Sequence, residues 1–302
     1  MSTTQRRLRP SMVAAVVTLA MLATSAVTTL GLSSAAGAAT ATTVFYLDIG
    51  ASVSVGVQPT SNAPQGQPTS RGYANRLVTL EAARGVTLQL TQLGCPGEST
   101  TTMMTGADKC YRYPDSQLTD AVAYLRSHHD QTGLVTIDLG FNDIAPCLQA
   151  MTVDAACVSQ NLAQLESQLP LIISALKAAA GANVTFIGLN HYNPYLAGSI
   201  NGLRGARFAS QSVAVLQQLN DVLQQVYDAN GIAVANVVKA FDQNAPRTST
   251  VLVNGRLIPA NALVACSLTW MCRRGPYGAN LHPNNAGYEA ITDAIAALLP
   301  NW

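Results

Sequence analysis

The stretch that decides the predicted fold is residues 134–143, which read LVTIDLGFND. Residues 134–139 are a short apolar run, which predicts a buried strand that ends at Gly140. A long helix is expected over 158–179, because leucines and isoleucines recur on one face, and Pro170 is expected to kink it. A buried strand followed by a long helix is the repeating unit of a parallel sheet with helices packed against it.

The rest of the chain repeats this unit. Further strands are expected over 44–47, 86–93, 184–189 and 232–237, and further helices over 73–83, 118–127, 208–227 and 286–299. This alternation predicts an α/β fold, a three-layer α/β/α sandwich with a central, mostly parallel sheet of about five strands. Two stretches, 53–71 and 242–283, are predicted to be long and irregular, and such stretches are usually functional or mobile.

The first forty residues carry the pattern of a secretory signal peptide. Arginines at positions 6, 7 and 9 precede an apolar stretch over about 12–32 and then small residues over 33–39. We therefore predict a signal peptide over 1–39, a single catalytic domain over 40–302 and a secreted, extracellular protein. The alternative is an uncleaved membrane anchor, since the apolar stretch is about long enough to span a bilayer. No stable membrane span is expected after cleavage.

Composition excludes several classes of protein. Of the 302 residues, 48% are hydrophobic and 11% are charged, which rules out bulk disorder and allows a large core. Removal of residues 1–39 would take away three arginines and no acid, and would change the formal net charge from +1 to −2. Because there is no basic excess, no nucleic acid is expected as a partner.

The six cysteines fall into three pairs of neighbours along the chain: Cys95 and Cys110, Cys147 and Cys157, and Cys266 and Cys272. Six cysteines can pair in many ways, so the sequence alone does not determine the connectivity. Pairing between neighbours is favoured, because short loops close at the least entropic cost. A zinc site is the rival interpretation, but the chain has no Cys-x-x-Cys motif and only four histidines. No metal or other cofactor is therefore expected.

Four short segments carry polar side chains where strands are expected to end or just before the last helix. They are 48–54 (DIGASVS), 94–100 (GCPGEST), 140–143 (GFND) and 281–288 (LHPNNAGY). In parallel sheets, ligands bind in the crevice beyond the carboxyl ends of the strands. A serine hydroxyl becomes a nucleophile when a histidine takes its proton, and preset donors then stabilise the oxyanion. Each segment alone is a weak signal, because serine and asparagine at strand ends are more often turn formers.

In this order the four segments resemble the SGNH hydrolases, also called the GDSL lipase/esterase family, over about residues 44–299. The resemblance implies an SGNH/flavodoxin-like fold in which Ser52 is the nucleophile and His282 is the base. It also implies an oxyanion hole formed by the N–H groups of Ser52 and Gly97 and by the side chain of Asn142.

Two positions depart from the family pattern. Ala51 stands where the Gly-Asp-Ser motif has its aspartate, so we expect a carboxylate network around the nucleophile to be lost. Ala279 stands three residues before His282, where the family has its acid. We therefore expect a Ser-His dyad in which a backbone carbonyl before His282 accepts from its Nδ1–H.

The predicted function is a secreted serine esterase or lipase that hydrolyses carboxylic esters through an acyl-enzyme on Ser52. The expected partner is a small-molecule or lipid ester. Three alternatives remain open. In the first, Asp48 or Asp242 supplies the missing acid. In the second, the same site serves an acyltransferase or a glycan deacetylase. In the third, the protein is a catalytically inactive, secreted binder of glycans or lipids. The sequence does not indicate the acyl-chain length or the oligomeric state.

Other polar residues near these segments are expected to be mainly structural. Asp143 is expected to accept from loop N–H groups. His191 is expected either to line the pocket or to be structural. Trp270 is expected to be a pocket wall or a packed aromatic. Arg273 and Arg274 are expected to be a solvated pair or a site for an anionic head group.

Overall fold

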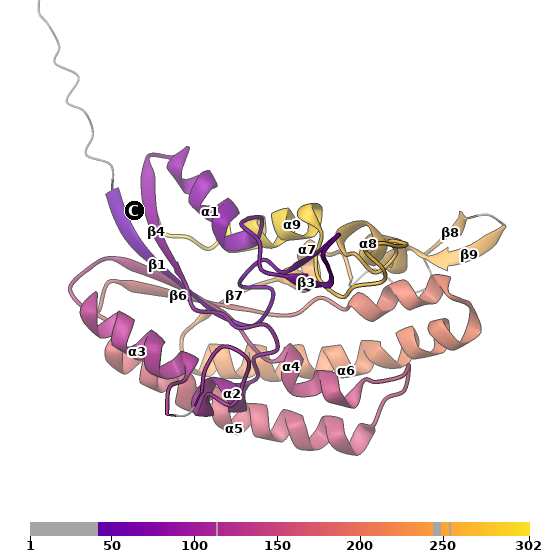
Figure 1. The fold of residues 1–302 in the computed structure, drawn as a ribbon, viewed down its shortest axis with the longest axis horizontal. Coiled ribbons are helices and arrows are strands. Elements are labelled where there is room, and N and C mark those ends of the chain that lie inside the picture. Colours follow the sequence, from indigo (N-terminus) through magenta and orange to yellow (C-terminus); the bar gives the residue numbers. More distant parts are fainter. Residues whose placement is uncertain (1–41, 113, 244–248, 254) are drawn as a thin grey trace, which may run out of the picture. The chain divides into compact units, whose positions relative to one another are not determined.

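The computed structural model describes residues 42–302, apart from 113, 244–248 and 254. The predicted signal peptide therefore lies outside the described residues. A five-stranded sheet forms the centre of the described domain (Figure 1). Its strands, in the order β4-β1-β5-β6-β7, are β4 (Val86–Gln92), β1 (Thr42–Gly50), β5 (Gly133–Asp138), β6 (Val184–Leu189) and β7 (Ala233–Ala235). Every pairing in this sheet is parallel, which confirms the predicted fold class.

Helices cover both faces of the sheet, as the sequence predicted (Figure 1). One face is covered by α1 (Tyr73–Ala82) and α9 (Asn285–Ala296), and the other by α3 (Gln117–Ser127), α5 (Ala155–Ala179) and α6 (Gly202–Ala229). The shorter helices of the described residues are α2 (Thr100–Thr105), α4 (Phe141–Ile144), α7 (Val237–Ala240) and α8 (Ala260–Leu268), with the 3-10 helices η1 (Ala145–Cys147) and η2 (Pro194–Ile200).

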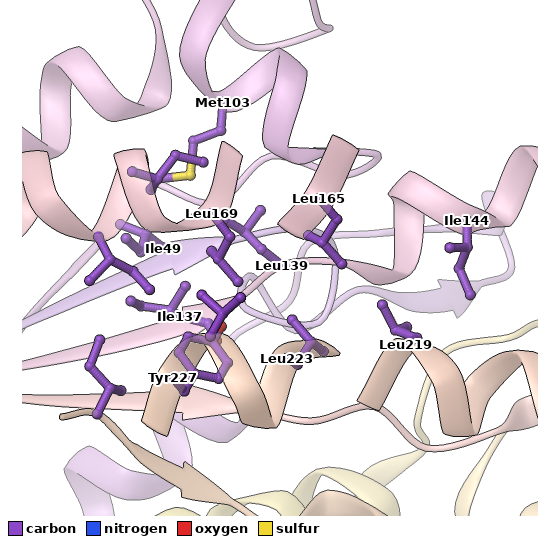
Figure 2. Close-up of a cluster of buried hydrophobic side chains, with 14 of the residues drawn as sticks. Ile49, Met103, Ile137, Leu139, Ile144, Leu165, Leu169, Leu219, Leu223 and Tyr227 are labelled. Atoms are coloured by element: carbon purple, nitrogen blue, oxygen red, sulfur yellow. The ribbon is translucent and has the colours of Figure 1, made fainter. Parts of the chain in front are cut away.

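The side chains of β1 show why a core forms on each face. Phe45, Leu47 and Ile49 belong to the core under α3, α5 and α6, whereas Val44 and Tyr46 belong to the core under α1 and α9. Successive side chains of a strand point to opposite faces, so a strand covered on both sides is apolar throughout. Figure 2 shows the first core, where strand residues meet leucines of α5 and α6: Ile49, Ile137, Leu139, Leu165, Leu169, Leu219 and Leu223.

The predicted elements of the sheet and its covering helices are all present, and the largest differences are at helix starts. The longest helix, α6, begins at Gly202 rather than at 208, because its first turn lacks the apolar spacing and leaves Leu203 exposed. At the start of α5, the Asp154 carboxylate caps the helix by accepting from the Cys157 N–H. This helix continues through Pro170.

Regular elements also occur in the two stretches that were expected to be irregular. The first contains a hairpin and the second contains a hairpin followed by α8: β2 (Gln58–Thr60) with β3 (Ala63–Gln67), and β8 (Thr250–Val253) with β9 (Arg256–Pro259). The expectation was therefore wrong for these parts. Each hairpin pairs only within itself. Most residues of β3, β8 and β9 are exposed or half-buried, so the sequence there has no continuous apolar run of the kind that predicts a buried strand.

Disulfides join each cysteine to its neighbour in sequence, as predicted: Cys95 to Cys110, Cys147 to Cys157, and Cys266 to Cys272. Cys95, Asp108 and Cys110 have the proximity of metal ligands, but the two sulfur atoms are bonded to each other. They therefore offer no thiolate to a zinc ion. Within the described residues, no helix combines the length and apolarity needed to cross a membrane.

Candidate active site

The loop of residues 51–57 follows β1 and carries Ser52 at the carboxyl edge of the sheet, and we call it the nucleophile loop after the predicted role of Ser52. The strand ends at Gly50, whose φ is +130° and where a Cβ would lie 2.1 Å from the Asp138 carbonyl oxygen. The N–H of Ala51 donates to that same oxygen at 2.9 Å. Only glycine fits this approach of the two strands, and the turn that follows leaves Ser52 partly exposed.

A carboxylate from β5 supports the nucleophile loop. Asp138 is buried, and its Oδ2 accepts from the Ser54 N–H at 3.1 Å. Burial raises the pKa of Asp138, while His191 and the N–H groups of the loop act in the opposite direction. The expectation that a carboxylate network is lost with Ala51 is therefore wrong, because a neighbouring strand supplies the carboxylate.

His191 lies buried on the other side of Asp138. Its Nε2 is 2.8 Å from the Leu139 carbonyl oxygen, and its Nδ1 is 3.7 Å from Asp138 Oδ1. Both ring nitrogens therefore face groups at the end of β5. This arrangement agrees with the structural interpretation of His191, which braces the carboxylate under the nucleophile loop.

The segments that carry Gly97 and Asn142 lie side by side. Gly97 is exposed and has a φ of +97°, a conformation that glycine adopts readily. The Asn142 Nδ2 donates to the Glu98 carbonyl oxygen at 3.0 Å, which places the amide beside Gly97. Asp143 accepts from the N–H of Thr100 at 3.1 Å and from its hydroxyl at 2.5 Å. Asp143 thus binds the loop as the sequence predicted.

Gln117 connects the segment of Gly97 and Glu98 to the nucleophile loop, and sequence reasoning missed it. We call this segment the oxyanion segment after the predicted role of Gly97. It is the first residue of α3 and is fully buried. Its Oε1 accepts from the Gly50 N–H at 2.6 Å, and its Nε2 donates to the Gly50 carbonyl at 3.0 Å and to the Glu98 carboxyl at 2.7 Å. One amide therefore joins the end of β1 to the residue after Gly97. In the sequence, only its place at the start of a predicted helix marks it.

Glu98 is a second buried acid at this site. Burial raises its pKa to about 8, with help from the Asp108 carboxylate and against the hydrogen bonds from Thr102 and Gln117. The Oδ2 of Asp108 is buried and has no hydrogen-bond partner among the described residues. Burial therefore favours the neutral form of the Glu98 carboxyl more than it is favoured in an exposed glutamate.

The histidine loop (residues 280–284) precedes α9, and a side chain within it holds the imidazole. The Asn280 Oδ1 is 2.7 Å from Nδ1 of His282 and 3.0 Å from its backbone nitrogen. The Asn280 Nδ2 donates to the carbonyls of Gln65 at 3.0 Å and Pro64 at 3.4 Å. Since the amide nitrogen faces two carbonyls, the amide oxygen faces the ring, and Nδ1 carries the proton. This corrects our expectation of a backbone carbonyl as the acceptor.

The surroundings of His282 keep the ring neutral. Burial lowers the pKa of His282 to about 4. Gly66 lies against the ring, since a Cβ there would be 3.6 Å from Nδ1 and 2.6 Å from a methyl group of Val57. With the proton on Nδ1, Nε2 is the nitrogen that can accept a proton from a hydroxyl.

Hydrogen bonds hold the nucleophile loop beside the histidine loop and α9. The Val57 N–H donates to the Ser52 carbonyl at 3.0 Å, and the Val57 carbonyl accepts from the Tyr288 hydroxyl at 2.9 Å. The Gln58 Nε2 donates to Asn285 Oδ1 at 3.2 Å. The structure therefore brings together segments that lie more than 200 residues apart in the chain.

The two acids considered as alternatives lie in other surroundings. Asp48 is buried in β1, and its carboxylate accepts from three side chains: Tyr73 at 2.6 Å, Thr136 at 2.8 Å and Gln92 at 3.1 Å. Burial raises the pKa of Asp48 to about 7. Asp242 is exposed after α7. The ring nitrogen that an acid would contact faces Asn280 instead.

Trp270 packs against the histidine loop. Its backbone N–H donates to the His282 carbonyl at 3.1 Å, and its ring lies 5.7 Å from that of Tyr277. The Arg273 guanidinium lies 6.0 Å from the indole, within the range of a cation–π contact. Trp270 is therefore a packed aromatic, and Arg273 is exposed but not free of contacts.

Comparison with known proteins gives a family and a shared fold. Residues 49–290 match the profile of the GDSL-like Lipase/Acylhydrolase family. Phospholipase A1 from Streptomyces albidoflavus NA297 is similar in structure, with a TM-score of 0.55 and 17% identity over 85% of this chain and 99% of that chain. An acetyl xylan esterase from Geobacillus stearothermophilus has a TM-score of 0.45 and 14% identity over 84% of this chain and 93% of that chain. No curated protein matches the chain.

The family match covers the nucleophile loop, the segments of Gly97 and Asn142, the histidine loop and four of the five strands of the sheet, and it begins at the end of β1. At 17% identity, the first structural likeness adds a shared fold. The chain therefore belongs to the GDSL-like lipase/acylhydrolase family, and it is a carboxylic ester hydrolase of that family.

Proposed function

We propose that this protein is a serine esterase or lipase that acts through an acyl-enzyme on Ser52. The Ser52 Oγ attacks the ester carbonyl carbon while Nε2 of His282 takes its proton, which then passes to the leaving alcohol. Water, activated by the same nitrogen, attacks the acyl-enzyme, releases the acid and restores the hydroxyl. The observation that carries this proposal is the contact between Asn280 and His282, which leaves Nε2 as the basic nitrogen.

The proposed oxyanion hole consists of the N–H groups of Ser52 and Gly97 and the amide of Asn142. Its support is the bond from Asn142 to the Glu98 carbonyl and the Gln117 amide that joins Glu98 to Gly50. These bonds fix the donors before the substrate arrives. Loss of one such donor typically lowers turnover by about 10²–10³-fold.

In this proposal Asn280 orients the base without supplying a charge. A carboxylate in that place would also stabilise the imidazolium that forms during the reaction, and an amide does so less strongly. The site is therefore a serine–histidine dyad, and the Asn280 amide takes the place of the acid of a triad. Asn280 is a positioning residue, because it contacts the base and not the ester.

A cavity of about 170 Å³ lies beside the proposed oxyanion hole, and most of its lining is polar: Ser99, Thr101, Asn142, Asp143, Pro146, Asn161 and Gln164. The cavity borders Asn142, and its lining suits a polar group of an ester whose carbonyl oxygen that amide would bind. It therefore supports, as a second candidate, deacetylation of a glycan or transfer of the acyl group to an alcohol. Analysis of the products with and without an alcohol acceptor separates hydrolysis from transfer.

Ser52→Ala tests the proposed nucleophile. We expect it to abolish hydrolysis across a panel of esters of increasing acyl-chain length and to abolish labelling by a fluorophosphonate. Ser61→Ala is the matched control, because Ser61 is an exposed serine near the tip of the β2–β3 hairpin. Activity that survives Ser52→Ala would contradict the proposal. A wild-type protein that neither labels nor hydrolyses any ester would favour the inactive binder.

We also propose that residues 1–39 are a signal peptide and that the enzyme acts outside the cell. The support is the basic, apolar and small-residue order of this segment, together with three disulfides, which persist in oxidising compartments. Amino-terminal sequencing of the protein recovered from the culture medium should give a start close to residue 40. An intact amino terminus retained in the membrane would contradict cleavage.

A further inference from the structure

The hairpin of β8 and β9 projects from the described domain beyond α8 (Figure 1). Its large apolar side chains are exposed rather than buried. Leu252 and Leu257 are each 68% exposed, and Val251 is 46% exposed. Apolar side chains that gather in this way on a surface mark a site of interaction.

The strand register shows which face of the hairpin is free. Leu252 pairs with Leu257, so both leucines lie on one face. Val251 pairs with Ile258, which is 4% exposed, so the other face is the one that packs toward the domain. The face that carries the two leucines therefore points to solvent.

The beginning of α6, which follows η2, adds a third exposed leucine. The Arg256 Nη1 donates to the Ile200 carbonyl at 3.3 Å, and this bond ties β9 to the end of η2. Leu203 follows three residues later and is 93% exposed. We call Leu203, Leu252 and Leu257 the apolar tip.

The segments that carry the apolar tip bear charges of a single sign. Arg204, Arg207 and Arg256 are exposed on these segments, and Arg204 also donates to the Ala150 carbonyl at 2.9 Å. Residues 167–220 and 243–288, which include η2, the first two turns of α6, the hairpin and α8, contain no aspartate or glutamate. The tip therefore combines apolar side chains with cations, and its own segments offer no carboxylate to pair with them.

The apolar tip is one short helix away from the histidine loop. Pro259 ends β9 and precedes α8. At the other end of α8, the Leu268 carbonyl accepts from the Asn284 N–H at 2.9 Å. Contact at the tip would therefore hold the histidine loop one short helix away from whatever surface the tip binds.

We propose that the apolar tip inserts into the surface of an anionic phospholipid bilayer, with the three arginines at the level of the head groups. Leucines gain free energy by leaving water for the acyl boundary, and arginines attract anionic lipid while their stems remain in apolar surroundings. This inference goes beyond the proposed function. Membrane binding does not involve Ser52, so the two proposals can fail separately.

Sedimentation with lipid vesicles tests the inference. We expect the protein to bind vesicles of phosphatidylcholine mixed with phosphatidylglycerol, to bind vesicles of phosphatidylcholine alone much more weakly, and to dissociate as salt is added. The double variant Leu252→Ser with Leu257→Ser should lose about ten-fold or more in binding, because binding scales with the apolar area inserted. Arg204→Gln with Arg207→Gln should weaken binding to the anionic vesicles alone.

Leu171→Ser is the matched control, because Leu171 is a 58% exposed leucine on α5, outside the tip. It should bind vesicles as the wild type does, and thermal unfolding should show that every variant is folded. Unchanged binding in the double leucine variant would overturn the inference. Failure of the wild type to bind anionic vesicles would overturn it as well. A wild-type dimer that the leucine substitutions dissociate would overturn it too, because the tip would then be covered by a second copy.

Discussion

At the scale of single residues, the orientation of His282 depends on one amide. The Asn280 Oδ1 accepts from the ring, and its Nδ2 donates to carbonyls of β3, so these partners distinguish the amide oxygen from the amide nitrogen. The amide selects the tautomer but brings no negative charge. Because no carboxylate of the described residues faces the ring to stabilise its charged form, burial lowers the pKa of His282 to about 4.

Asn280→Asp should raise the pKa of His282, because a carboxylate would replace an amide oxygen that lies 2.7 Å from Nδ1. The acid limb of the kcat/KM profile should then move upward by roughly one pH unit or more. Asn280→Leu removes the acceptor and leaves buried groups unpaired, so kcat should fall by about ten- to a hundred-fold. Ester hydrolysis measured from pH 4 to 9 checks both variants.

Asn285→Asp is the control for the charge change, since it places a carboxylate near the histidine loop, at an exposed position that is bonded to Gln58. Its pH profile should stay close to that of the wild type. If Asn280→Asp leaves the acid limb where it was, Asn280 is not the group that faces the titrating nitrogen.

At the scale of elements, the site depends on how strand ends and helix starts are joined. Gln117, at the start of α3, joins the end of β1 to the oxyanion segment. Asn284 caps α9 by accepting from the N–H groups of Ala286 and Gly287. These polar side chains replace the hydrogen bonds that strands and helices leave unmade at their ends.

Gln117→Leu should lower both stability and turnover. The change removes the side-chain acceptor of the Gly50 N–H and one donor each from the Gly50 carbonyl and the buried Glu98 carboxyl, which keep the Cys95 N–H and the Thr102 hydroxyl. The free energy of unfolding should fall by about 1–3 kcal/mol, and kcat should fall with it as Gly97 moves. Chemical denaturation and hydrolysis of a soluble ester measure the two effects. Gln218→Leu, at an exposed position of α6, should change neither, and equal effects from both substitutions would contradict the role of Gln117.

At the scale of the whole described domain, the sheet buries an acid between its two helical layers. Asp48 has no exposed surface, and burial raises its pKa from an ordinary value of 3.8 to about 7. The folded state therefore prefers the neutral carboxyl. This preference stabilises the fold fully below about pH 4 and is lost as the pH rises through about 7.

Asp48→Asn should remove this contribution to the pH dependence, because the amide does not ionise. The wild type should lose stability relative to the variant as the pH is raised from 4 to 8, even if the variant is less stable at the lowest pH. Unfolding free energies from denaturant titrations at several pH values measure the difference. Asp221→Asn, an exposed acid on α6, should show no such trend. A constant difference between wild type and Asp48→Asn would contradict the prediction.

Much of this architecture could be predicted from the sequence because it depends on neighbours along the chain. The apolar run of β5 and the periodic leucines of α5 are local patterns, and they determine the element type and the order of layers. Pairing of neighbouring cysteines follows in the same way, since short loops close most easily. The four polar segments were visible because each follows a strand or precedes a helix.

Only the tertiary structure decided which groups surround those segments. The acceptor for His282 is the Asn280 side chain, whose orientation is set by Gln65, 215 residues away. The carboxylate at the nucleophile loop comes from Asp138, and the bridge to Gly97 comes from Gln117. A hydrogen bond forms wherever packing brings a donor to an acceptor, and contacts between distant segments leave no periodic trace in the sequence. The sequence by itself therefore determined the scaffold and the candidate residues, while long-range packing decided how the base is oriented.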